Sequence, residues 1–198
     1  MLAALGFGCA KQTPATLLGF EGELVIQSQM STGPATTTVV HINGDKAQAQ
    51  LPSNTGAVVV LIADGRTKKN TWLFHSKHEA IVEPMVAHPA TSSPKVTPTG
   101  RHDVVAGTDC EIVELRTVSG AFDEVCVASD LTAATQAFTP IADELLDSTE
   151  DLPMSGFPLR VLMRGPSGAV IGRMEVTKID RVAQPSALFE IPTGFTRA

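Results

Sequence analysis

The three cysteines are the residues of this chain whose positions most clearly indicate chemistry. Cys9 ends a short apolar run, residues 1–8, and a polar stretch over residues 11–16 follows it. An apolar run that ends in small residues before a cysteine is typical of a bacterial lipoprotein signal, in which cleavage leaves the cysteine to carry acyl chains. We therefore expect residues 1–9 to be the remnant of such a signal, Cys9 to be lipidated, and residues 10–17 to be a tether.

Two details of the N-terminus leave an alternative open. No basic residue precedes the apolar run, and Phe7 stands two positions before Cys9, where a small residue is usual. A start upstream of Met1 would supply the basic residues, whereas the alternative is an irregular N-terminus in which Cys9 is a buried or free thiol. Ala10 follows the cysteine. The aspartate associated with retention in the inner membrane is thus absent, which favours the outer membrane of a bacterium.

Cys110 and Cys126 are expected to form a disulfide. The residues between them read as two β segments around a turn at residues 118–120, and folding this hairpin symmetrically about Val118 places the cysteines directly opposite each other. Non-hydrogen-bonded partners on antiparallel strands have Cα atoms about 4.5 Å apart, within bridging range. Closing the loop would contribute about 3 kcal/mol. A disulfide supports export to an oxidising compartment, and two reduced core thiols are the alternative.

The remaining reactive side chains indicate little chemistry. His75 and His78 form the one histidine cluster, but residues three apart on a strand face opposite sides, so we expect surface histidines and no metal site. The sequence has no Gly-x-Ser-x-Gly motif, no phosphate-binding glycine loop and no Cys-x-x-Cys motif. We therefore expect no catalytic residues and no cofactor. A hydrolase is kept as the third hypothesis, and it would need a polar cleft with a histidine held by a carboxylate.

The composition excludes several classes of protein. Hydrophobic residues make up 43% of the 198 residues, which excludes wholesale disorder. The formal net charge is −6 and no basic stripe with interleaved aromatic residues occurs, which argues against nucleic-acid binding. Tyrosine is absent and tryptophan occurs once, so stacking platforms for bases or sugars are not expected. No other window reaches the roughly 18 apolar residues of a membrane-spanning helix, so an N-terminal lipid would be the link to a membrane.

Most of the chain has the pattern of β structure. Asn43-Gly44 and Asp64-Gly65 predict hairpin turns. A segment rich in proline, serine and threonine, residues 87–100, reads as a loop. The expected strands cover residues 22–30, 35–42, 45–51, 57–63, 70–75, 78–84, 157–163 and 169–179, with the cysteine hairpin between the sixth and seventh.

Helical spacing replaces the β pattern after Ser129. Asp130 can cap a helix, and Leu131, Ala134 and Phe138 recur on one face of it. Thr139-Pro140 predicts the start of a second short helix, because proline suits a first helical turn. The helical pair interrupts an otherwise continuous antiparallel sheet, so we expect it to lie across one face. The fold class is therefore mainly β (α+β), with residues 18–198 forming a single domain.

Several stretches in this order resemble a known family of exported bacterial proteins, domain of unknown function 4412. They are residues 98–112, 124–128, 156–160, 175–179 and 186–195. The closing residues 188–195 also resemble the C-terminal signature of the wider LolA/LolB-like lipoprotein-carrier superfamily. The resemblance implies a curved antiparallel sheet, a half-open barrel, with one or two short helices on its concave face. In the carriers that cavity holds acyl chains. The family of unknown function implies no activity.

A curved sheet covered by helices on one face would have an apolar interior, and an ordinary core would use the same residues. The candidates for lining an apolar cavity are Leu24, Ile26, Val40, Ile42, Val59, Leu61, Trp72, Phe74, Phe138, Leu145, Leu159, Val161 and Met163. Two functions follow. The protein binds an acyl chain or other apolar ligand beneath a movable helical cover at residues 130–152, or it is a structural or adaptor lipoprotein with a packed core and a protein partner.

Overall fold

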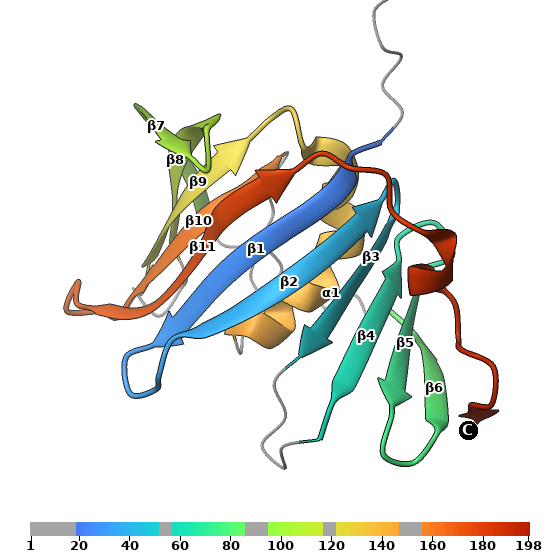
Figure 1. The fold of residues 1–198 in the computed structure, drawn as a ribbon. Helices are drawn as coiled ribbons and strands as arrows, with labels where there is room; N and C mark the ends of the chain where they lie inside the picture. The colour runs from blue at the N-terminus through green and yellow to red at the C-terminus, as the bar shows by residue number, and fades with distance from the viewer. Residues whose placement is uncertain (1–18, 52–56, 86–94, 117–121, 147–155) are drawn as a thin grey trace, which may run out of the picture.

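The computed structural model describes residues 19–51, 57–85, 95–116, 122–146 and 156–198, and Cys9 with the tether lies outside them. The described residues form one open, curved sheet of 12 strands with a single α-helix on its inner side (Figure 1). The expected curved, mainly β fold is confirmed, and the sheet does not close into a barrel. The first six strands are β1 (Glu21–Met30), β2 (Thr36–Asn43), β3 (Lys46–Leu51), β4 (Val59–Asp64), β5 (Lys69–Phe74) and β6 (Glu79–Pro84).

The second half of the chain extends the sheet from the other side of β1. Its strands are β7 (Lys95–Val105), β8 (Thr108–Arg116), β9 (Phe122–Ala128), β10 (Phe157–Arg164), β11 (Val170–Asp180) and β12 (Thr196–Arg197). The strand order is β12-β6-β5-β4-β3-β2-β1-β11-β10-β9-β8-β7. All pairs are antiparallel except β12 with β6. The last long strand, β11, therefore pairs with the first, β1, and joins two meanders into one sheet.

The expected pair of short helices is one helix, α1 (Thr132–Leu146), with Pro140 inside it. A proline within a helix removes one backbone hydrogen bond and disfavours the helix locally. Here Phe138 and Ile141, on either side of Pro140, are both fully buried against the sheet. The packing of this apolar face keeps the helix continuous past Pro140, so the prediction that a second helix starts there was wrong.

The hairpin turns lie where the sequence predicted them, but their registers differ. Asn43 pairs with Lys46, so the two-residue turn is Gly44-Asp45, with Gly44 at a φ of 62°. Asp64 pairs with Lys69 across a longer turn, because the Asp64 carboxylate accepts backbone N–H bonds from Arg66 (3.0 Å) and Thr67 (2.9 Å). Burial raises the pKa of Asp64, but these bonds, a further one from the Thr67 side chain and the charge of Lys46 together lower it.

The prediction of a loop over residues 87–100 was wrong for its second half. β7 begins at Lys95 and contains Pro98, while residues 86–94 lie outside the described part. Proline is tolerated in an edge strand because its missing N–H can face away from the ladder, and β7 is the last strand of the sheet. The register shifts between Pro98 and Arg101, where Gly100 has a φ of 67°, so a bulge accommodates this segment.

The C-terminal segment, residues 181–198, crosses to the outer side of the sheet. It contains a short 3-10 helix, η1 (Ser186–Phe189), and ends in β12 beside β6 (Figure 1). Phe189 packs with outward-facing side chains of β4 to β6 in a second apolar cluster; the buried members from the sheet are Val60, Ile62, Leu73 and Ala80. This cluster explains why residues 59–63 of β4 are all apolar: both faces of the strand are covered.

Candidate functional site

The inner face of the sheet and the helix α1 enclose the main apolar core, which contains most of the candidate cavity residues. Nine of them belong to one connected cluster of buried side chains: Leu24, Ile26, Val40, Ile42, Leu61, Phe138, Leu145, Leu159 and Val161. Strand alternation explains the set, because alternate residues of β1 and β2 point to the same face. Ser28 and Thr38 are the buried polar residues among the described ones.

Four candidates are not fully buried. Trp72 and Met163 are partly buried and pack against the main core. Val59 and Phe74 are partly exposed, and neither belongs to the main core cluster. The Trp72 indole Nε1–H donates a hydrogen bond of 2.6 Å to Glu83 Oε1, which holds its polar edge at the rim of the core.

Helix α1 covers the inner face with a mixture of small and large side chains. Ala134, Ala137 and Ala142 are buried in it, and they allow its backbone to approach the sheet. The Phe138 ring lies 4.6 Å from the Phe157 ring of β10, centroid to centroid, tilted by 36°. This contact ties the middle of the helix to the sheet. The expected helical cover extended to residue 152, but residues 147–155 lie outside the described part.

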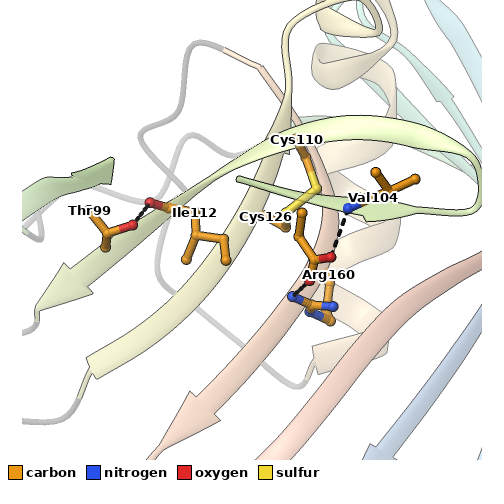
Figure 2. Close-up of a disulfide and its surroundings, with 7 residues drawn as sticks. Thr99, Val104, Cys110, Ile112, Cys126 and Arg160 are labelled. Atoms are coloured by element: carbon orange, nitrogen blue, oxygen red, sulfur yellow. Dashed lines mark hydrogen bonds and ion pairs between the residues drawn. A yellow bond between two sulfur atoms is a disulfide. The ribbon is translucent and has the colours of Figure 1, made fainter. Parts of the chain in front are cut away.

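Cys110 and Cys126 form a disulfide, with an S–S distance of 2.04 Å and a Cα–Cα distance of 5.3 Å (Figure 2). The predicted register was wrong by two residues: Cys126 lies opposite Ile112. The disulfide therefore joins diagonal neighbours, which the twist of the strands brings within bridging range. The turn that the prediction centred on Val118 lies outside the described residues.

An ion pair between Asp103 and Arg160 crosses over the disulfide. Asp103 of β7 lies opposite Cys110, and Arg160 of β10 lies opposite Cys126. The Arg160 guanidinium donates a hydrogen bond of 2.7 Å to Asp103 Oδ2, and the Val104 N–H donates one of 2.8 Å to Oδ1 (Figure 2). These bonds lower the pKa of Asp103, that from Arg160 most strongly. The strands must curl towards this face for the pair to meet, and both cysteines are buried beneath it.

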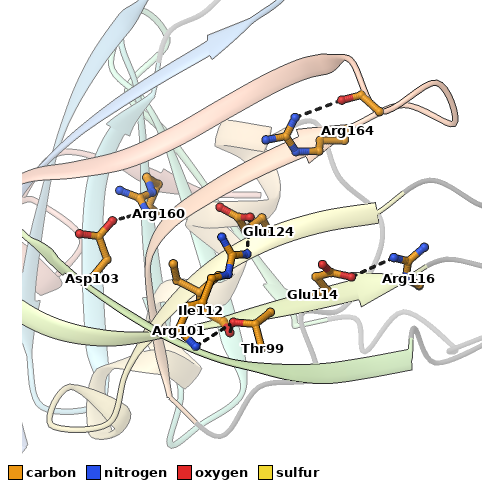
Figure 3. Close-up of polar contacts among 10 residues, drawn as sticks. Thr99, Arg101, Asp103, Ile112, Glu114, Arg116, Glu124, Arg160 and Arg164 are labelled. Carbon is orange, nitrogen blue, oxygen red and sulfur yellow. Dashed lines mark hydrogen bonds and ion pairs between the residues drawn. The ribbon is translucent and has the colours of Figure 1, made fainter.

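The outer face of β7 to β11 carries further pairs of arginine and carboxylate, which the sequence reasoning missed. Arg101 contacts Glu124 at 2.7 Å and Arg116 contacts Glu114 at 2.9 Å (Figure 3). Arg173 also pairs with Glu175. The signal was present in the sequence, because charged residues recur at every second position in segments such as 114–116, where alternate side chains share one face.

A groove of about 480 Å³ lies on the outer face of β2 and β3, beside η1. Its lining is Thr36, Thr37, Val39, His41, Gln48, Gln50, Leu51 and Leu188. The lining combines hydroxyl and amide groups with the apolar side chains of Val39, Leu51 and Leu188, so it suits a ligand that offers both neutral hydrogen-bonding groups and apolar surface. The groove was not predicted, since it depends on the C-terminal segment that crosses from β11 to β6 and supplies Leu188.

His41, in this groove, is the histidine that comes nearest to the arrangement a hydrolase would need. Its Nδ1 lies 3.8 Å from Glu23 Oε2 and 2.9 Å from Gln184 Oε1. The hydroxyl of Thr36, another residue of the groove lining, lies 2.8 Å from that of Ser28. Within the described residues, no hydrogen bond joins His41 to a hydroxyl or thiol, the contact by which a general base activates a nucleophile.

The predicted histidine cluster lies in the turn between β5 and β6 and not on a strand. The rings of His75 and His78 both contact Phe195, with centroids 5.3 Å and 5.8 Å from it. Both side chains are exposed, as expected, but they share a neighbour because the chain bends between them. Among the residues that the structure describes, no group of three metal-ligating side chains could hold an ion, and no helix is long and apolar enough to cross a membrane.

Comparisons with known proteins place the chain in a family. The family described as "Domain of unknown function (DUF4412)" matches residues 20–195, so the predicted resemblance is confirmed. No curated protein matched the sequence.

Solved structures share the fold at low sequence identity. An uncharacterized conserved protein from Thermus thermophilus is 11% identical at a TM-score of 0.58, covering 91% of each chain. PNGF-II is 12% identical at a TM-score of 0.52, and the match covers 90% of this chain and 30% of that chain. A LolA superfamily protein from Nitrosomonas europaea is 9% identical at a TM-score of 0.33, and the match covers 86% of this chain and 89% of that one. The first two similarities, with TM-scores above 0.5, concern the fold alone.

Proposed function

The chain belongs to the DUF4412 family, and we propose that it serves as an exported, lipid-anchored, non-enzymatic protein that binds an acyl chain or other apolar ligand between α1 and the inner face of the sheet. The observation that carries the proposal is the continuous apolar layer there, drawn from strands in both halves of the sheet and covered by one helix. A ligand would enter as α1 moves away, replacing helix contacts such as Phe138–Phe157.

Two observations support export and anchoring. The Cys110–Cys126 disulfide fits a protein that folds in an oxidising compartment. Cys9, outside the described residues, stands in the context of a lipoprotein signal. We propose that Cys9 carries the lipid and that the domain is held at the periplasmic face of a bacterial membrane, with the outer membrane favoured.

Trp72 offers a direct test, because it is the one tryptophan of the chain and packs against the inner core. We would titrate the chain carrying Cys9→Ser with a dansyl-labelled fatty acid and follow energy transfer from Trp72. We expect saturable transfer that unlabelled fatty acid reverses and that Trp72→Phe abolishes. Transfer that is absent or cannot be saturated, from a chain that circular dichroism shows to be folded, would contradict the proposal.

A matched pair of variants locates the binding. Leu145 of α1 is buried in the inner core, whereas Leu188 of η1 lines the outer groove. We expect Leu145→Ala to weaken binding of the labelled fatty acid and Leu188→Ala to leave it unchanged. The reverse result would place the ligand in the outer groove.

The outer groove favours the second candidate function, an adaptor whose core stays packed. A partner segment with exposed amide groups would meet Gln48 and Gln50 in this groove. We would place a photo-crosslinking amino acid at Gln50 and, as a control, at Thr177 of β11, which lies outside the groove lining. We expect one discrete adduct in the periplasm from position 50 alone. Equal labelling from both positions would argue against a groove-specific partner.

A further inference from the structure

A row of cationic side chains crosses the outer face at one end of β7 to β10. Arg116 of β8 lies opposite Phe122 of β9, and Phe122 lies opposite Arg164 of β10. Lys95 of β7 lies opposite Arg116 and extends the row. Directly opposed residues in an antiparallel sheet share a face, so these four side chains, the cationic row, point the same way. Arg116 and Arg164 lie at the same end of their strands in Figure 3.

The cationic row differs in charge from the rest of this face. Arg101, Arg160 and Arg173 each meet a carboxylate of their own. In the row, Glu114 pairs with Arg116, but the structure pairs neither Lys95 nor Arg164 with a carboxylate among its described residues. The one hydrogen bond that Arg164 donates goes to the Gly168 carbonyl, at 3.0 Å. The row therefore keeps an excess of positive charge in a chain whose net charge is −6.

The Phe122 ring fixes the two guanidinium groups. The Cζ atoms of Arg116 and Arg164 lie 5.2 Å and 5.9 Å from the ring centroid. Cation–π contacts of this kind orient a guanidinium while leaving most of its N–H donors available. One guanidinium can donate a hydrogen bond to each of the two oxygens of a carboxylate. A phosphate group offers more oxygens and can accept from both groups across the ring, with Lys95 supplying a third cation.

The surroundings of the row suit a phosphate group on an amphipathic molecule. Val170 lies opposite Arg164 on β11 and is 47% exposed, and Ile171 next to it is 42% exposed. Cationic and apolar side chains side by side are the combination that anionic lipid surfaces attract. We propose that the cationic row is a binding site for phosphate groups, independent of the apolar layer under α1. The phosphate comes from a lipid headgroup or from a soluble phosphate.

The test uses the full chain carrying Cys9→Ser, so that no acyl chain of its own confers membrane binding. We would measure co-sedimentation with phosphatidylglycerol vesicles and with phosphatidylcholine vesicles, with and without added inorganic phosphate. Calorimetric titration would measure binding of inorganic phosphate to the chain alone. Arg164→Gln removes the guanidinium that has no carboxylate partner among the described residues. Arg173→Gln is the control, because it removes the same formal charge from an arginine that has a carboxylate partner. Equal urea midpoints would verify that both variants fold.

We expect the parent chain to bind phosphatidylglycerol vesicles, with Arg164→Gln weakening binding about tenfold and Arg173→Gln changing it by less than about twofold. Competition by inorganic phosphate would identify the phosphate group alone as sufficient, and binding that resists competition would identify the lipid headgroup as the source. Absence of binding to vesicles and to inorganic phosphate would overturn the proposal. Equal losses in the two variants would also overturn it, because they would trace binding to overall charge.

Discussion

The two faces of this sheet are stabilised by different means, although the same strands form both. On the inner face, one helix buries side chains such as Leu24, Ile42 and Leu159 in a single core. On the outer face, the strands β4 to β6 are covered by the C-terminal segment through Phe189, while β7 to β10 carry paired charges such as Asp103–Arg160. The inner face thus depends on burial and the outer face largely on local contacts.

This difference bears on function. On the proposed function, the apolar layer under α1 takes an apolar ligand, and the charged outer face takes polar or anionic partners. The comparison predicts that substitutions at the inner face reduce stability most, and that outer-face substitutions act mainly on local structure.

The largest expected effect comes from removing an aromatic ring of the inner face. Phe138→Ala should cost about 3–5 kcal/mol, because the ring is 1% exposed and the cavity left behind cannot collapse fully. Phe189→Ala, on the outer face, should cost nearer about 2 kcal/mol, because the C-terminal segment can detach without unfolding the sheet. Urea denaturation measures both. Equal costs would mean that the outer cluster is part of one cooperative core.

The disulfide ranks next. Replacing both Cys110 and Cys126 by serine should cost about 3 kcal/mol, because the unfolded chain then regains the freedom of the loop between them. Thermal unfolding with and without reductant would provide the same comparison without mutation. A double-serine variant as stable as its parent would show that the Asp103–Arg160 pair and the strand ladder suffice to hold this end of the sheet.

Substitutions at two glycines compare a contact with rigid backbone and a contact with a flexible side chain. A Cβ at Gly22 would collide with the backbone carbonyl oxygen of Asp180, whereas a Cβ at Gly172 would meet the flexible end of the Met163 side chain. Gly22→Ala should therefore cost about 1–3 kcal/mol and Gly172→Ala less than about 1 kcal/mol. Urea midpoints would measure this order, and the opposite order would show that β1 and β11 can separate locally at little cost.

The smallest effect concerns Asp103. Its pKa in the folded protein is lowered, first by the hydrogen bond from Arg160, so its contribution to stability is present above the unfolded pKa of about 3.9 and is lost as the pH falls through the lowered value. Asp103→Asn should lower Tm slightly at neutral pH, because the pair is partly exposed to solvent, which screens it. The Tm difference from the parent should shrink below about pH 4 and then vanish. A difference that is independent of pH would trace the effect to packing over the disulfide.

Local patterns predicted much of the fold and little of the outer surface. Alternation of apolar residues identified the strands and the inner set from Leu24 to Val161, because each depends on the period of a single strand. The break at Pro140 was wrongly predicted because tertiary packing outweighed a local preference. The pairing of Cys126 with Ile112 was missed because the register depends on residues across the hairpin.

The groove and the cationic row could not be predicted from the sequence of any single segment, because each combines residues from several elements. Leu188 reaches the groove only because the C-terminal segment crosses from β11 to β6, and Arg116 meets Arg164 only through the order β8-β9-β10. Sequence reveals which residues share a face of one strand, but strand order decides which faces meet. The resemblance of several stretches, residues 186–195 among them, indicated the family, and it did not indicate what those residues contact.

Native mass spectrometry tests the central claim, that the layer under α1 holds an apolar ligand. The chain carrying Cys9→Ser, exported into a bacterial periplasm behind an added signal sequence and purified gently, would be weighed before and after denaturation. We predict a mass excess of a few hundred daltons that denaturation releases as lipid, on a chain two hydrogens lighter than its dithiol form. A bare chain with the disulfide intact, which also fails to take up added fatty acid, would contradict the claim and leave the adaptor with a packed core.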